Sequence, residues 1–131
     1  MDIYREEILD HYRNPRNKGE LKGANKKARK DSPLCAEADW VEIFLSVEEG
    51  RIKDIKFQGK GCVISMAATS MLTERVKGKS LTDVAAISED EIRADFGGAL
   101  STSRETCAFL SLWTLRSALG LKIDENKTNQ N

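Results

Sequence analysis

The sequence lacks several features that would place it in common functional classes. Its 21 Lys and Arg residues balance 21 Asp and Glu residues, and zero net charge argues against nucleic acid as a main partner. No apolar run approaches the roughly 20 residues that cross a bilayer. The mixed charges of residues 1–7 do not resemble a signal peptide. We therefore expect a cytoplasmic protein that works without a membrane.

Cysteine and histidine are also scarce, with three of the first and one of the second. An odd number of cysteines in a cytoplasmic chain points away from disulfides and toward metal or thiol chemistry. Cys35, Cys62 and Cys107 form no Cys-x-x-Cys pair, which excludes a zinc ribbon or a thioredoxin-like motif. His11 stands at the carboxyl end of a predicted helix, where a cation suits the helix dipole, so a structural role is favoured over a ligand role.

The length predicts one domain over residues 1–121, followed by a disordered polar tail at 122–131. Asp2 is expected to cap a first helix that runs to Tyr12 and that Asn14-Pro15 ends. Alternating apolar residues then predict a strand over 41–47, covered on both faces in its first half. A Glu49-Gly50 turn leads into a hairpin partner over 51–58. Residues 24–30 are interpreted as a polar edge strand.

The stretch around Cys62 is expected to change from strand to helix. Gly59 and Gly61 allow backbone conformations with positive φ. Apolar residues with helical spacing follow, as far as Gly78, so Cys62 is predicted near the amino end of a helix. The helix dipole there favours the thiolate, which is the form that binds metals. The alternative is that Cys62 is an ordinary small buried residue.

Three further helices are predicted from their capping signals. Ser80-x-x-Asp83 and Ser88-x-x-Glu91 indicate the starts of two short helices, and Phe96-Gly97-Gly98 breaks the pattern after them. Thr102-x-x-Glu105 indicates a capping box for a last helix that ends at Gly120. Cys107 then lies in the second turn of that helix, again near an amino end.

The predicted hairpin brings two cysteines to one end of the sheet, because Cys35 precedes its first strand and Cys62 follows its second. Clustered thiolates repel one another unless a cation holds them, so the arrangement favours a metal. Zinc and iron–sulfur clusters both take thiolate ligands in tetrahedral geometry. A fourth ligand is needed, and Glu37 and Asp39 are the nearest candidates.

Residues 13–30 are strongly basic, with Glu20 as the single acidic residue. Such a run is typical of a solvated segment. The alternative is a docking surface for an acidic partner protein, because a patch of one sign steers encounter.

Four motifs in order carry a family resemblance that extends to about Leu121. They are Tyr12-Arg13-Asn14-Pro15-Arg16-Asn17-x-Gly19, Pro33-Leu34-Cys35, Phe57-x-Gly59-x-Gly61-Cys62-x-Ile64-Ser65-x-Ala67 and Arg104-x-x-Cys107-Ala108-x-Leu110. The chain resembles the IscU/NifU-like scaffolds of iron–sulfur cluster assembly. This resemblance implies an α+β fold with a small antiparallel sheet, helices packed on one side, and the three cysteines grouped at one end. It also implies a partner cysteine desulfurase that supplies persulfide sulfur.

The chain also departs from that family. Cys35-Ala36-Glu37 replaces the usual Cys-Gly-Asp, Thr106 replaces the histidine of IscU before the third cysteine, and the chaperone-docking stretch of IscU is absent. The region around Cys107 resembles the SufU branch, which is described as a zinc-binding sulfur acceptor, but the SufU insertion before it is missing.

Two main hypotheses follow from the resemblance. In the first, the chain is a scaffold and sulfur acceptor, not an enzyme, that holds a transient iron–sulfur cluster, of the 2Fe–2S type, and passes it to recipient apo-proteins or cluster carriers. Cys35, Cys62 and Cys107 are then the ligands, with Glu37 as a labile fourth and Cys35 as the persulfide acceptor. In the second, the chain is a Zn²⁺-bound adaptor that activates a desulfurase without holding a cluster. A third, a thiol enzyme, lacks a general base, since no motif pairs His11 with a cysteine.

Overall fold

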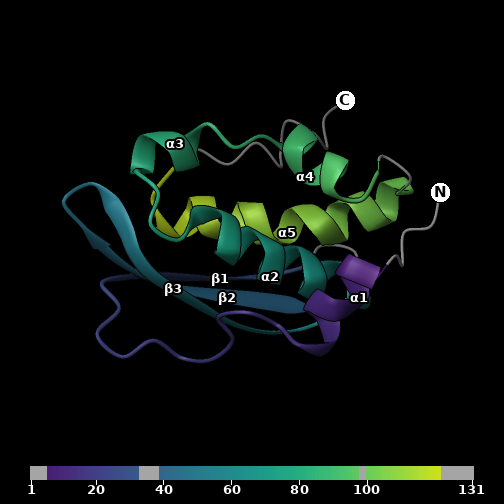
Figure 1. The fold of residues 1–131 in the computed structure, drawn as a ribbon, viewed down its shortest axis with the longest axis horizontal. Helices are drawn as coiled ribbons and strands as arrows, with labels where there is room; N and C mark the ends of the chain where they lie inside the picture. Colours follow the sequence, from purple (N-terminus) through teal and green to yellow (C-terminus); the bar gives the residue numbers. More distant parts are fainter. Residues whose placement is uncertain (1–5, 33–38, 98–99, 122–131) are drawn as a thin grey trace.

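The computed structural model describes residues 6–32, 39–97 and 100–121, which form three strands and five helices (Figure 1). In chain order these are α1 (Glu6–Arg13), β1 (Lys26–Asp31), β2 (Trp40–Glu48), β3 (Arg51–Lys60), α2 (Val63–Val76), α3 (Leu81–Ala85), α4 (Glu89–Asp95) and α5 (Thr102–Ala118). The fold is α+β, as predicted. Asp2 and the tail at 122–131 lie outside the described residues, so the expectations for them stay predictions.

The sheet is antiparallel throughout and has the order β1-β2-β3. The β2–β3 hairpin turns at Glu49 and Gly50, which both have positive φ, and pairs Trp40 with Lys60 at its far end. The predicted polar edge strand exists, shifted to Lys26–Asp31, and pairs with β2 from Leu45 back to Trp40. The open end of the hairpin therefore lies where β2 begins and β3 ends, and the chain enters α2 from there.

The helices pack on one face of the sheet in two layers (Figure 1). In β2, alternate side chains such as Val41, Ile43 and Leu45 are fully buried against α2 and α5, which lie side by side. Helices α3 and α4 cover the outer side of α5. On the opposite face of the sheet Phe44 is 5% exposed, which confirms that this part of β2 is covered on both sides. Helix α5 lies between the sheet and the outer helices, and all its residues from Cys107 to Leu115 are buried.

The outer edge of β3 is occupied by two chain segments. The N–H of Gly19 donates to the Phe57 carbonyl at 2.7 Å, and the N–H of Phe57 donates to the Asn17 carbonyl at 2.9 Å. Nearer the hairpin turn, Ile52 exchanges backbone hydrogen bonds with Gly78 and Lys79. These bonds satisfy backbone groups that would otherwise attract another chain. The segment after α1 is thereby fixed beside β3, opposite the β1 edge.

A buried polar joint connects α1 with α2. His11 is 7% exposed and its Nδ1 lies 2.8 Å from the Ser70 hydroxyl oxygen, which also accepts a hydrogen bond from the N–H of Arg16. Asn17 donates to the Thr73 hydroxyl at 3.0 Å. Burial is the main cause that lowers the pKa of His11. The predicted structural role fits this geometry, but its predicted reason, a cation on the helix dipole, is wrong.

The predicted capping signals place helix starts to within one residue. Ser80 and Ser88 cap α3 and α4, and Ser88 with Glu91 forms a complete capping box. For α5 the cap is Ser101, whose hydroxyl accepts from the N–H of Arg104, and not the predicted Thr102. Among the described residues, no helix is long and apolar enough to cross a membrane.

Candidate metal centre

Cys62 is positioned by the tight connection between β3 and α2, where it is the N-cap residue and is exposed. Gly59 and Gly61 do not adopt the predicted positive φ. They are needed for close approach instead. A Cβ at position 59 would lie 2.7 Å from the Trp40 carbonyl oxygen, and one at 61 would lie 2.3 Å from the Ser65 hydroxyl oxygen. The two glycines therefore let the chain pass close to the start of β2 immediately before the thiol.

Asp39 is positioned by the first residue pair of the hairpin. It directly precedes Trp40, which pairs with Lys60, so Asp39 and Cys62 emerge at the same end of the sheet. The same hypothetical Cβ at Gly61 would lie 3.3 Å from the Asp39 carboxyl carbon. The direction that the sheet imposes on Asp39 thus turns its carboxylate toward Cys62.

Cys107 lies in the second turn of α5, as predicted, and is 8% exposed. The turns around it are anchored to α4 by Arg93, which donates to Glu105 at 2.7 Å and lies 5.2 Å from the centre of the Phe109 ring. Helix α4 is in turn bound to α2 through Arg75, which donates to both carboxylate oxygens of Asp95 at 2.6 Å. These contacts fix the end of α5 from which the Cys107 sulfur faces the other two groups.

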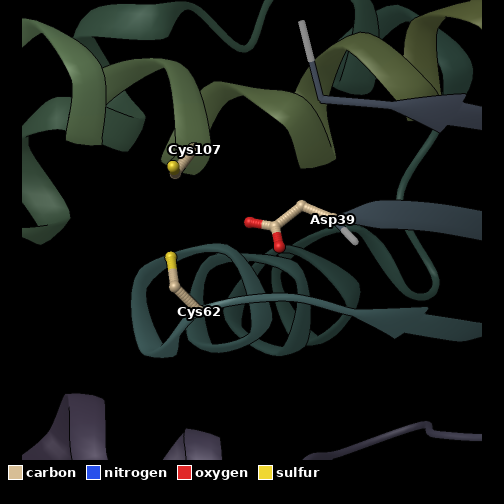
Figure 2. Close-up of side chains that lie close together, drawn as sticks. All are labelled: Asp39, Cys62 and Cys107. Atoms are coloured by element: carbon tan, nitrogen blue, oxygen red, sulfur yellow. The ribbon is translucent and has the colours of Figure 1, made fainter. Parts of the chain in front are cut away.

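The three side chains converge on one space from three separate elements (Figure 2). One carboxylate oxygen of Asp39 and the sulfurs of Cys62 and Cys107 all lie within 4.8 Å of one another. Two sulfurs bonded at about 2.3 Å to one tetrahedral ion lie roughly 3.8 Å apart. The three groups therefore have to approach one another by about 1 Å or less to share an ion. Two thiols and a carboxylate are a donor set that fits zinc or iron.

The pKa of the Cys62 thiol is lowered from 9.0 to about 5. The main cause is a hydrogen bond from the Cys107 thiol, and the backbone N–H groups of Ser65 and Ile64 and the Ser65 hydroxyl add to it. Partial burial of the sulfur acts in the opposite direction. The lowered pKa favours the thiolate of Cys62 at neutral pH, which is the protonation state that a metal ligand needs.

The outcome for the predicted site residues is mixed. Cys62 and Cys107 meet as predicted, whereas Cys35 and Glu37 lie outside the described residues and stay predictions. Asp39, the second choice for the carboxylate, is the one that the described structure brings to the thiols. Ser65 was missed as a neighbour of the Cys62 sulfur, at 3.8 Å between Sγ and Oγ. Its place three residues after an N-cap was the available signal.

The sequence matches a family model described as the NifU-like N terminal domain over residues 3–128. It is 35% identical over 117 residues to the iron–sulfur cluster assembly scaffold protein IscU 1 of Archaeoglobus fulgidus, covering 89% of this chain and 74% of that protein. It is 31% identical over 119 residues to IscU of Escherichia coli K12, covering 88% and 91%.

A second group of similar proteins bears the name SufU. The zinc-dependent sulfurtransferase SufU of Bacillus subtilis is 38% identical over 87 residues, covering 66% of this chain and 57% of that protein. A solved structure from Fervidobacterium islandicum, described as an iron–sulfur cluster assembly scaffold protein for the SUF system, superposes with a TM-score of 0.78 at 25% identity. The superposition covers 89% of this chain and 96% of that one.

Proposed function

The chain belongs to the NifU-like N-terminal domain family, and we propose that it is an iron–sulfur cluster assembly scaffold that accepts sulfur and holds a nascent cluster. The observation that carries this proposal is the meeting of Cys62, Cys107 and Asp39 at one end of the sheet. The cluster is cargo that the protein receives and passes on, and the protein acts as a carrier without turning over a substrate of its own.

The proposed ligands are Cys35, Cys62 and Cys107, completed by a carboxylate. Glu37 was the first choice from the sequence, and the position of Asp39 beside both sulfurs supports Asp39 as its rival. Carboxylate oxygen is a harder ligand than thiolate, so iron or zinc holds it less firmly. Such a ligand can leave when an acceptor thiol approaches. The mixed donor set therefore suits transfer better than permanent storage.

Sulfur is proposed to come from a cysteine desulfurase that carries it as a cysteine persulfide. A thiolate of the scaffold, proposed to be that of Cys35, attacks the outer sulfur of this persulfide. A sulfur–sulfur bond forms on the scaffold while the one on the desulfurase breaks, and the desulfurase cysteine leaves as thiolate. No net oxidation or reduction occurs in this exchange, because one persulfide replaces another.

A second candidate is a zinc-bound adaptor that activates a desulfurase without holding a cluster. Two observations favour it: the likeness to a zinc-dependent sulfurtransferase, and donor atoms spaced for a single ion. Zinc would hold the cysteines as thiolates. When another ligand replaces one of them on the ion, that thiolate would be free to accept sulfur. The cytoplasm is the proposed location in both cases.

Metal content distinguishes the two functions. The protein is purified without oxygen, its zinc is measured, and it is then incubated with ferrous iron and sulfide. The scaffold function predicts a brown protein that contains iron and sulfide and transfers both to an apo-ferredoxin. A colourless protein that retains one zinc per chain and excludes iron would favour the adaptor and contradict the scaffold.

Two single variants identify the labile carboxylate. Glu37→Ala and Asp39→Ala are loaded separately, and the transfer of metal or cluster to a thiol acceptor is timed. The variant that lacks the fourth ligand should transfer more slowly yet still bind metal, because it loses the oxygen that an incoming thiol displaces, while water or a solvent thiol fills the vacant place. An effect in Asp39→Ala alone assigns the role to Asp39, an effect in Glu37→Ala alone assigns it to Glu37, and no effect in either contradicts a carboxylate ligand.

A further inference from the structure

A hollow of about 370 Å³ lies beside the connection that leads to Cys62. Its lining combines apolar side chains, lysines and glycine backbone: Tyr12, Pro15, Lys18, Phe57, Gly59, Lys60, Gly61 and Met66. Phe57 and Met66 are buried and form its apolar wall. Gly61 belongs both to this lining and to the connection that places Cys62, so the hollow adjoins the metal centre.

The rim of this hollow is exposed, and the charged side chains that the described residues place on it are both lysines. Tyr12, 41% exposed, is the one large hydrophobic residue that the described structure leaves open to solvent. The side chains of Lys18 and Lys60 are exposed, and neither has a carboxylate partner within the described part of the chain. The Lys18 ammonium lies 5.9 Å from the centre of the Phe57 ring, over the apolar wall. Among the described residues, none of those that line the hollow carries a carboxylate.

These features select one kind of occupant. An exposed aromatic ring beside an apolar wall contributes binding energy when a large apolar side chain covers it. Two ammonium groups without counter-charge favour a carboxylate on the approaching segment and speed its encounter. A peptide segment that places a large apolar side chain next to an acidic residue satisfies both demands. A second copy of this rim would bring like charges together.

We propose that the hollow formed by Tyr12, Lys18, Phe57, Lys60 and Met66 is the docking site for an acidic segment of the cysteine desulfurase. This inference rests on the proposed function, because it takes the desulfurase as the partner. A segment seated here lies against Gly61, one residue from Cys62. Docking at the hollow thus brings the sulfur donor next to the thiols that receive its product.

The basic run of residues 13–30 extends along both edges of the sheet, and only its first part lies beside the hollow. Lys18 is fixed beside the outer edge of β3, whereas Lys26 and Lys27 lie in β1 at the opposite edge of the sheet. Lys26 and Lys27 are exposed, as Lys18 and Lys60 are. Reversal of either pair of charges changes the net charge equally. The pair in β1 is therefore a matched control for the pair at the hollow.

The test measures binding to the desulfurase of the same organism for the wild type, Lys18→Glu/Lys60→Glu, Tyr12→Ala and the control Lys26→Glu/Lys27→Glu. Charge reversal at the hollow should slow association about tenfold or more at low salt, and less at high salt. Tyr12→Ala should weaken binding by roughly tenfold through faster dissociation. At 0.1 M salt the control should stay within about twofold of the wild type, because exposed charges then act only over about 10 Å.

Each outcome decides the proposal. Wild-type affinity in Lys18→Glu/Lys60→Glu, or an equal loss in the β1 control, overturns it. Iron, sulfide and zinc loading of every variant is measured in parallel and should match the wild type, since none of these side chains lies among the donor atoms. A wild-type protein that loads a cluster but does not bind the desulfurase overturns the docking site and leaves the scaffold function standing. Failure of the wild type to load metal overturns the function instead.

Discussion

Helices α3, α4 and α5 each begin at a serine whose hydroxyl accepts a hydrogen bond from a backbone N–H of the first turn. Helix α2 begins at Cys62 with the same extended backbone, and a thiol stands there in place of a hydroxyl. The four starts thus share a conformation and differ in one atom, oxygen in three cases and sulfur in the fourth. At α2 the N–H groups of Ile64 and Ser65 act on the thiolate and lower its pKa.

The difference suits the role that we propose for Cys62, in which a helix cap serves as a metal ligand. A serine cap satisfies N–H groups and typically stabilises a helix by about 1 kcal/mol relative to alanine. A thiolate in the same place uses the N–H groups and the helix dipole to stay deprotonated. It keeps its lone pairs available to a metal. On the proposed function, helix α2 therefore exchanges part of its own capping for a proposed metal ligand.

The largest expected effect is that of Cys62→Ser, which gives α2 the same cap as the other three helices. The variant should fold with a free energy of unfolding within about 1 kcal/mol of the wild type. Iron or zinc binding should fall by more than tenfold, because hydroxyl oxygen is a poor ligand for these metals. Metal analysis after reconstitution and urea denaturation of the apo-protein measure the two quantities. Normal loading with normal stability would show that Cys62 is only a helix cap.

A smaller but sharp effect concerns the pH dependence of Cys62 alkylation in the apo-protein. Alkylation needs the thiolate, and the lowered pKa keeps the thiolate populated down to a pH of about 5. The iodoacetamide rate should therefore be nearly constant from pH 8 to about 6, where the rate for an ordinary cysteine falls in proportion to its thiolate fraction. In Cys107→Ala the main cause of the shift is removed, so the profile should move to higher pH. An unchanged profile in that variant would contradict the assigned cause.

The sequence predicted the serine-capped starts well because capping is a local property. Ser80 and Ser88 each have a suitable residue three positions later, and both act as predicted. The start of α5 was misplaced by one residue, because Ser101, Thr102 and Ser103 can all cap and local chemistry does not choose among them. This error of one residue does not move Cys107 out of the second turn.

The metal centre was less predictable, because its parts come from three elements. The hairpin pairing correctly indicated that the start of β2 and the end of β3 lie together. The orientation of Asp39, however, depends on the pairing of Trp40 with Lys60 and on the close approach at Gly61. No sequence pattern predicts the exact pairing of Trp40 with Lys60 or the close approach at Gly61. The predicted reason for Gly59 and Gly61 was positive φ, whereas the structure needs them for close approach of the chain. The two requirements select the same residue, so the sequence does not distinguish them.

The smallest expected effect is that of removing one of the serine caps. Ser88→Ala deletes the hydroxyl that accepts from the N–H of Glu91 at 3.3 Å. It should lower the free energy of unfolding by about 1 kcal/mol and leave metal loading unchanged. Denaturation and metal analysis of this variant are the counterpart of those for Cys62→Ser. A loss of metal in Ser88→Ala would contradict the distinction between the two helix starts, because the serine at the start of α4 is expected to act as a cap alone.

X-ray absorption at the zinc edge of the zinc-loaded protein measures directly whether the cap of α2 is a metal ligand. The wild type should show three sulfur neighbours at about 2.3 Å and one oxygen neighbour at about 2.0 Å. The Cys62→Ser variant, loaded at high zinc, should show one sulfur fewer, and Ser88→Ala should match the wild type. The same sulfur count in Cys62→Ser as in the wild type would place Cys62 outside the metal site and contradict its role as a ligand.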